Sequence, residues 1–185
     1  YTPQNNTTNL NNTLNLIGTY TDIAGNAGST ASTRNFAIDT NAAPPPVDLI
    51  NRQVTFAEAD YSLQTVLRVG AGESQITAQN ISLNGAVQGL NSNAVNEVLS
   101  LTADNDVLLS GAVSGLDALS VSAKNVTFDK GVSVGGQLTI NASGRVQFDN
   151  VVTLTDAGGL DIVGATEVVF ANGAKVQVVG DLSSS

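Results

Sequence analysis

The side chains of this sequence that could do acid–base or metal chemistry are mostly carboxylates. The chain of 185 residues has 16 Asp and Glu against 7 Lys and Arg, and it contains no His, Cys, Met or Trp. A Ser-His-Asp triad, a thiol nucleophile, a zinc finger and a haem site are therefore excluded. The formal net charge of −9 repels phosphate backbones, which predicts that nucleic acid is not a partner.

Two pairs of charged residues occupy matching places in a repeated pattern. Asp129 follows an apolar-x-Phe triplet and Asp149 follows the next such triplet, while Asp104 corresponds to Lys124. Paired carboxylates about 5–9.5 Å apart hydrolyse glycosidic bonds, and a base beside carboxylates would suit a polysaccharide lyase. The alternative is a solvated surface of stacked turns. We favour that alternative and predict no enzyme activity, because the chain has no long loops to build a substrate cleft.

The elements that would position these residues are short strands. No segment has a helical period, and apolar-x-apolar pairs recur between Gly, Asn, Asp and Ser. The first pairs of successive repeats are 20, 19 and 22 residues apart and begin at Leu99, Leu119, Leu138 and Leu160. The second and third series begin at Val107, Val126, Val146 and Val168, and at Val113, Val132, Val152 and Val176. An earlier repeat contains Ile76 and Ile81, with an enlarged loop over 88–97.

Three short strands per repeat, with no helix between them, predict an all-β parallel β-helix of five to six coils. We expect the right-handed form. Phe128, Phe148 and Phe170 should stack as an inward ladder, and Asn105 and Asn125 should align as an Asn ladder. An antiparallel sandwich is the rival fold, but it predicts hairpin turns rather than repeats in the same phase.

The repeats resemble those of filamentous haemagglutinin and related large bacterial exoproteins. The resemblance covers about residues 76–179 and is carried by Leu119-Ser-Val-Ser-Ala-Lys-Asn-Val-Thr-Phe128 and Leu138-Thr-Ile-Asn-Ala-Ser-Gly-Arg-Val-Gln-Phe148. It implies a solenoid architecture and an extracellular or cell-surface location.

The first 43 residues resemble the end of a bacterial Ig-like adhesin module. The matching segments are Tyr1-Thr-Pro3, Gly18-Thr-Tyr-Thr-Asp22-Ile-Ala-Gly-Asn26 and Phe36-Ala-Ile-Asp39-Thr-Asn-Ala-Ala-Pro44. Such a module is usually about twice as long, so its sheet would be completed by another chain or by upstream sequence, or the segment would remain partly disordered. We therefore expect a partial Ig-like β segment with donor strands over 1–43, a Pro-rich linker over 44–53, an N-terminal cap or first coil over 54–74, and the parallel β-helix over 75–185.

The adhesin resemblance implies calcium at the interdomain linker. Asp22, Asn26 and Asp39 would supply oxygen ligands, and Asp48 would close the site just after the prolines. Calcium takes carboxylate and carbonyl ligands, and this chain has no soft ligands to offer. The alternative is that Asp22 and Asn26 only set a turn through bonds from their side chains to the backbone.

These observations lead to three hypotheses of function. The first is a non-enzymatic extracellular structural or adhesive protein, a β-solenoid subunit or segment of a bacterial surface fibre that self-associates head to tail by strand addition. The second is a stalk or glycan-binding section of a giant secreted adhesin, with neighbouring domains and surface glycans as partners. The third is a polysaccharide lyase or hydrolase. No run of 18 apolar residues occurs, which predicts no membrane-spanning helix.

Overall fold

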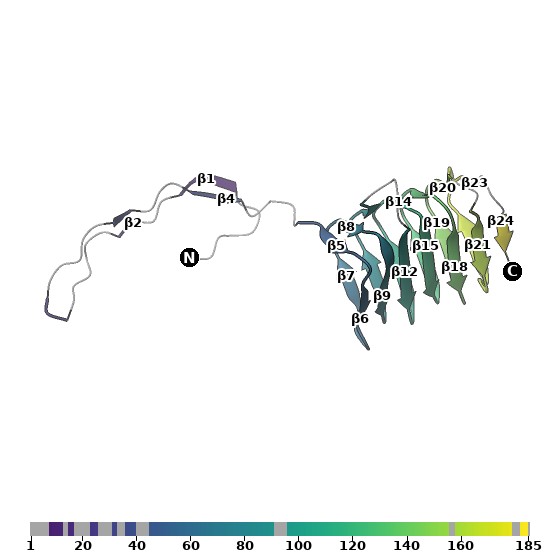
Figure 1. Cartoon of the computed structure of the whole chain (residues 1–185), viewed down its shortest axis with the longest axis horizontal. Coiled ribbons are helices and arrows are strands. Elements are labelled where there is room, and N and C mark those ends of the chain that lie inside the picture. The colour runs from purple at the N-terminus through teal and green to yellow at the C-terminus, as the bar shows by residue number, and fades with distance from the viewer. Residues whose placement is uncertain are drawn as a thin grey trace. The chain divides into compact units, whose positions relative to one another are not determined.

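Figure 1 shows the computed structural model of the chain, which divides into two compact units, Tyr1–Ala43 and Pro44–Ser185. The residues described in full are 23–25, 45–90, 96–155 and 158–178. The backbone alone is described for the strand residues 8–12, 15–16, 31–32, 36–39 and 182–184. All regular elements of the described residues are β-strands.

The unit of residues 1–43 contains two antiparallel strand pairs among its described residues. β1 (Thr8–Asn12) pairs with β4 (Phe36–Asp39), with a register shift between Asn9 and Asn12. β2 (Asn15–Leu16) pairs with β3 (Ala31–Ser32). The Ig-like character of this unit stays a prediction.

The unit of residues 44–185 is a parallel β-solenoid of about six turns (Figure 1). Each turn contributes one strand to each of three parallel sheets, named A, B and C in chain order. Sheet A consists of β5 (Val47–Leu49), β8 (Leu67–Val69), β11 (Val87–Gly89), β14 (Val113–Leu116), β17 (Val132–Val134), β20 (Val152–Leu154) and β23 (Val176–Val178). Sheet B consists of β6 (Gln53–Thr55), β9 (Gly72–Ala78), β12 (Glu97–Ala103), β15 (Ala118–Ala123), β18 (Leu138–Ala142), β21 (Leu160–Val163) and β24 (Leu182–Ser184). Sheet C consists of β7 (Tyr61–Leu63), β10 (Ile81–Leu83), β13 (Asp106–Leu109), β16 (Asn125–Phe128), β19 (Arg145–Phe148) and β22 (Glu167–Phe170).

The predicted repeat register is confirmed in all three sheets. In sheet B, Leu99 pairs with Leu119, Leu119 with Leu138, and Leu138 with Leu160. The Val107 series is in register through sheet C, and the Val113 series is in register through sheet A. Alternate residues of a strand point to one face of the sheet, so each apolar-x-apolar pair places two side chains in the core. Burying one such Leu or Val side chain contributes about 1.5–3 kcal/mol.

The predicted phenylalanine ladder is also confirmed. The ring centroids of Phe128 and Phe148 are 5.1 Å apart with an interplanar angle of 5°, and those of Phe148 and Phe170 are 5.2 Å apart with an angle of 11°. Phe128 and Phe148 are fully buried, whereas Phe170 is 44% exposed. The difference arises because Phe170 lies in β22, the last strand of sheet C, which has a neighbour on one side only.

The solenoid begins in the segments for which the sequence predicts a Pro-rich linker, over 44–53, and a cap or first coil, over 54–74. Val47–Leu49 form β5, which pairs in parallel with β8, and Gln53 opens β6, which pairs with β9. Residues 61–69 form β7 and β8, ordinary strands of sheets C and A. The short apolar-x-apolar pair Val47-Asp48-Leu49 is enough for a coil strand, because proline excludes only its own position from a ladder.

Candidate functional site

The corner between sheets B and C holds a column of polar residues that runs along the solenoid. Each of them directly precedes the first inward residue of a sheet C strand, so the strand register places them above one another. The column, called the corner ladder below, consists of Asp60, Asn80, Asp106, Asn125, Arg145 and Glu167.

Hydrogen bonds join every neighbouring pair of the corner ladder except the last, which is an ion pair. The Nδ2 of Asn80 donates to Oδ1 of Asp60 at 2.7 Å, and its Oδ1 accepts from the backbone N of Asp106 at 3.2 Å. Asn125 repeats this arrangement, donating to Oδ1 of Asp106 at 2.8 Å and accepting from the backbone N of Arg145 at 2.9 Å. Nε of Arg145 lies 3.5 Å from Oε2 of Glu167. The polar atoms of this column are thus largely occupied by one another.

The predicted Asn105–Asn125 ladder is wrong by one position. Asn125 pairs with Asp106 instead, and the backbone N–H groups of Lys124 and Asn125 both donate to the carbonyl oxygen of Asn105. The reason is the length of the corner: three residues separate Ala103 from Val107, but only two separate Ala123 from Val126. The extra residue moves Asn105 out of the column and Asp106 into it.

A shallow depression with a volume of about 360 Å³ lies beside the corner ladder, at the ends of the middle sheet B strands. Its lining includes Ala103, Ala123 and Ala142, the last inward residues of their strands, which are 7%, 8% and 3% exposed and belong to the core. Val163, which is 37% exposed, adds an apolar wall. The polar lining consists of Asp104, Ser122, Lys124, Asn141 and Ser143. This surface is called the corner depression below.

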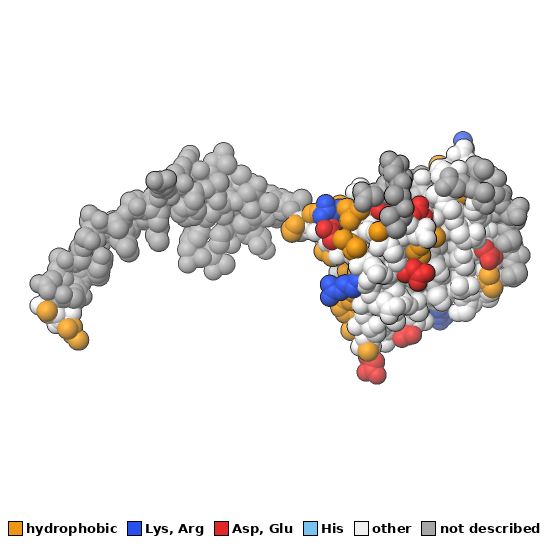
Figure 2. All heavy atoms as spheres, viewed as in Figure 1, with side chains coloured by type: hydrophobic (Ala, Val, Ile, Leu, Met, Phe, Trp, Pro, Cys, Tyr) orange, Lys and Arg blue, Asp and Glu red, His pale blue; other side chains and the backbone are white. Residues whose placement is uncertain are grey.

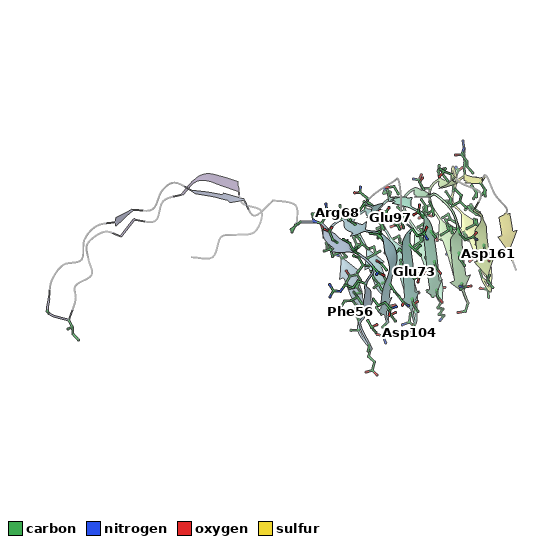
Figure 3. All side chains as sticks on the ribbon, viewed as in Figure 1. Phe56, Arg68, Glu73, Glu97, Asp104 and Asp161 are labelled. Carbon is green, nitrogen blue, oxygen red and sulfur yellow. The ribbon has the colours of Figure 1, made fainter. Side chains whose placement is uncertain are left out.

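The polar side chains of the corner depression form no hydrogen bond or ion pair with any other described residue. This includes Asp104 and Lys124, whose opposite charges line the same depression without approaching to ion-pair distance. In Figure 3, Asp104 lies at the lower edge of the solenoid, where the strands of sheet B end. The donors and acceptors of the polar side chains in the corner depression are therefore available to solvent or to a bound molecule.

The middle of sheet B continues the corner depression as an uncharged polar face. Its outward residues stand in register, Ser100 with Ser120 and Thr139, and Thr102 with Ser122 and Asn141. These six residues, called the hydroxyl face below, make no side-chain hydrogen bond to any described residue. Figure 2 shows mainly white over this part of the sheet, and Figure 3 places Glu73 and Asp161 on the same sheet, in β9 and β21.

The carboxylates of Asp129 and Asp149 are each held by a neighbour. Oδ2 of Asp129 accepts from the hydroxyl of Ser110 at 2.8 Å, and Oδ1 of Asp149 accepts from Nε2 of Gln147 at 2.6 Å. Each follows a stacked Phe, so the two lie one coil apart in the same column, about 4.8 Å in backbone spacing. These contacts fit a solvated turn surface, and the lyase or hydrolase hypothesis stays untested.

The structure describes the side chain of one of the four expected calcium ligands. Both carboxylate oxygens of Asp48 accept hydrogen bonds from the guanidinium group of Arg68. Nε of Arg68 donates to Oδ1 at 2.6 Å, and Nη2 donates to Oδ2 at 2.9 Å. Asp22, Asn26 and the side chain of Asp39 lie outside the described residues. In the described part of the chain no three His, Cys, Asp or Glu residues cluster so as to hold a metal ion. The calcium site stays a prediction.

The first coil contains an apolar pocket that sequence analysis missed. It has a volume of about 180 Å³ and is lined in part by Val54, Phe56 and Tyr61. The rings of Phe56 and Tyr61 stack with their centroids 4.7 Å apart. Burial raises the pKa of the Tyr61 hydroxyl above its ordinary value of 10.0. The aromatic residues of 54–69 were a visible signal, but only the coil brings the two rings together.

Glu97 is the second feature that sequence analysis missed. It is 1% exposed at the start of β12, and its backbone N–H donates to Oδ2 of Asp117 at 2.8 Å. A Cβ added at Gly89 would clash with the backbone carbonyl of Gly115 and also meet Oε2 of Glu97, and the backbone clash requires a glycine there. The signal in the sequence is its position two residues before Leu99, because the alternation of β12 places Glu97 on the inward face.

Comparison of the chain with models of protein families, with curated proteins and with solved structures finds no match. The described residues include no helix that is long and apolar enough to cross a membrane. The fold and the corner geometry are therefore the observations on which a function can be argued.

Proposed function

We propose that this chain is a non-enzymatic extracellular structural or adhesive protein, a β-solenoid subunit or segment of a bacterial surface fibre. The observation that carries the proposal is the uninterrupted core. Inward residues from β8 to β21 are buried in every coil, and the surface above them is mainly small and polar. Each coil of such a stack contacts only its neighbours, so the architecture suits a repetitive mechanical element.

The more specific form of the proposal is head-to-tail assembly by strand addition. The described sheets of residues 1–43 have two strands each, β1 with β4 and β2 with β3. Two-stranded sheets are marginally stable alone, and their open edges can pair with a further strand. A neighbouring chain that supplied this strand would stabilise the sheet and join two subunits. Contacts of this kind that do not close on themselves produce filaments.

The second candidate function is the stalk or glycan-binding section of a larger adhesin. It is favoured by the corner depression and the hydroxyl face, whose polar side chains have no partner among the described residues. This candidate predicts discrete particles rather than filaments, which separates it from the first.

Electron microscopy of the full chain, with calcium and again after a chelator, tests the proposal. Long filaments with a regular subunit repeat are expected, and their loss in chelator would assign calcium to the junctions. Deleting residues 1–43 should abolish filaments while circular dichroism still reports a folded β-solenoid. Filaments formed by the truncated chain would disprove strand donation, and separate particles under all conditions would favour the adhesin section.

A further inference from the structure

The sequence contains two Asn-Gly pairs, and each of them is followed by Ala. Asn84-Gly85 lies in the turn between β10 and β11, and Asn172-Gly173 lies in the turn between β22 and β23. Asn-Gly pairs are prone to spontaneous deamidation, because glycine has no Cβ to hinder attack by its backbone nitrogen on the Asn side chain. Since the tripeptide Asn-Gly-Ala is the same at both sites, a difference in their reactivity would come from the fold.

The reaction takes place within the chain and consumes only water. The backbone nitrogen of the glycine loses its proton to a solvent base and attacks Cγ of the asparagine, which closes a succinimide ring. The Cγ–Nδ2 bond breaks, and the nitrogen takes up a proton and leaves as ammonia. Water then adds to either ring carbonyl carbon. Opening at Cγ gives aspartate, and opening at the main-chain carbonyl gives isoaspartate, in which the backbone runs through Cγ.

The turn that contains Asn172 and Gly173 leaves this reaction unhindered. Both residues are exposed, and a Cβ added at Gly173 would meet no atom within 4 Å. The turn is closed by the backbone N–H of Ala174, which donates to the carbonyl oxygen of Ala171 at 2.9 Å. The N–H of Gly173 itself makes no hydrogen bond to a described residue. The attacking nitrogen and its path to Cγ are therefore both open.

The same tripeptide at Asn84 is locked between neighbouring coils. A Cβ added at Gly85 would lie 2.0 Å from the carbonyl oxygen of Thr65, and one added at Gly111 would lie 2.0 Å from that of Gly85. The backbone of Gly85 thus touches the coil on each side, and the N–H of Asn84 donates to the carbonyl oxygen of Leu63 at 2.8 Å. Ring closure must turn the peptide plane between Asn and Gly. At Asn84 this segment would first have to leave the stack, although the Asn84 side chain is exposed.

We infer that Asn172 is a self-modification site, converted in the folded chain to isoaspartate and aspartate, while the stacked coils protect Asn84. The inference does not depend on the proposed function. The product adds a negative charge to the turn that also contains Lys175. Isoaspartate also lengthens the main chain between β22 and β23, in a coil whose Phe170 is 44% exposed. The modification therefore changes both the charge and the backbone of this coil as the protein ages.

The experiment is incubation of the full chain at physiological temperature in neutral and in mildly alkaline buffer. Samples taken at intervals are mapped by peptide mass spectrometry, and isoaspartate is identified by labelling with isoaspartyl methyltransferase. Modification at Asn172 should accumulate, and it should be faster in the alkaline buffer because the attacking nitrogen must lose its proton. Asn84 should react at least about tenfold more slowly, which corresponds to about 1.4 kcal/mol for local opening of the coil.

Incubation in concentrated guanidinium chloride is the matched control, because the unfolded chain presents the same tripeptide at both sites. The two rates should then be similar. Asn172→Gln should abolish modification at this position, since the longer side chain closes its ring far more slowly, and it should leave thermal melting and the rate at Asn84 unchanged.

Three outcomes would overturn the inference: equal rates at the two sites in the folded chain, no reaction at Asn172 in the folded chain, or a rate difference that persists after unfolding. None of them bears on the proposed fibre, because filaments are scored separately by electron microscopy.

Discussion

Asn125 uses both ends of its side-chain amide to join three consecutive coils. It donates to the Asp106 carboxylate on one side and accepts from the Arg145 backbone on the other. A side chain with one donor and one acceptor end is suited to this place, because a carboxylate there would face Asp106 with a like charge. The hydrogen bonds of the corner ladder thus depend on the type of each side chain, while the strand register places these side chains above one another.

We expect Asn125→Ala to lower the free energy of unfolding by about 1–2 kcal/mol, because it removes two hydrogen bonds that contribute about 0.5–1.5 kcal/mol each. Urea denaturation measures the change. Asn105→Ala is the matched control, since the Asn105 side chain makes no hydrogen bond to a described residue, and it should change stability by less than about 0.5 kcal/mol. Equal losses in the two variants would contradict the corner ladder.

Gly111 lies where two successive coils touch at the corner between sheets C and A. A Cβ added at Gly111 would lie 2.0 Å from the carbonyl oxygen of Gly85, which is backbone and cannot turn away. Gly111→Ala should therefore destabilise the solenoid by about 1–3 kcal/mol, as measured by thermal melting. At Gly131, in the same corner of the next coil, the nearest atom is 3.6 Å from the added Cβ. A Gly131→Ala loss as large as that of Gly111→Ala would be inconsistent with this account.

Among the elements, sheet C is distinguished by its stack of aromatic side chains. β16, β19 and β22 align Phe128, Phe148 and Phe170, so each strand adds one ring to the stack. A parallel register repeats identical residues at one level, and nearly parallel rings then fill the core without gaps. The ladder is therefore a property of three strands together and of no single one.

Phe148→Ala should cost about 3–5 kcal/mol, because Phe148 is fully buried between two rings and its removal leaves a cavity. Phe170→Ala is the control in the same column. Phe170 is 44% exposed, so its loss should cost less than about 2 kcal/mol. Chemical denaturation of both variants gives the comparison, and a larger loss at Phe170 would refute the assigned burial.

At the scale of the whole solenoid, stability should vary along the stack. Middle coils have a neighbour on both sides, whereas β22 belongs to a coil whose Val168 and Phe170 are 38% and 44% exposed. In a solenoid each coil is stabilised by its nearest neighbours, so end coils open more easily.

Amide hydrogen exchange followed by mass spectrometry should show this gradient. We expect the slowest exchange in β12, β15 and β18 and faster exchange in β22 and β23. If the proposed assembly buries the end coils against a neighbouring chain, filaments should exchange more slowly there than dispersed protein. Uniform exchange along the described strands would contradict a stack of locally stabilised coils.

The repeat, the three strands per coil and the inward residues could all be derived from the order of the amino acids. Apolar-x-apolar spacing depends only on the two-residue period of a strand. The leucine series that runs from Leu99 to Leu160 and the phenylalanine ladder could therefore be aligned without coordinates. The start of the solenoid was less visible, because Val47-Asp48-Leu49 is a single short pair that follows three prolines.

The contacts at the corners became visible only in the folded chain. Whether Asn105 or Asp106 joins Asn125 depends on one extra residue in a turn, which the periodic strands on either side do not reveal. The corner depression and the polar side chains that line it likewise depend on contacts between residues about 20 positions apart. Strand periodicity is a local property of the chain, whereas corner geometry is set by how successive coils stack. Because the candidate binding surface lies at a corner, the strand periodicity alone did not reveal it.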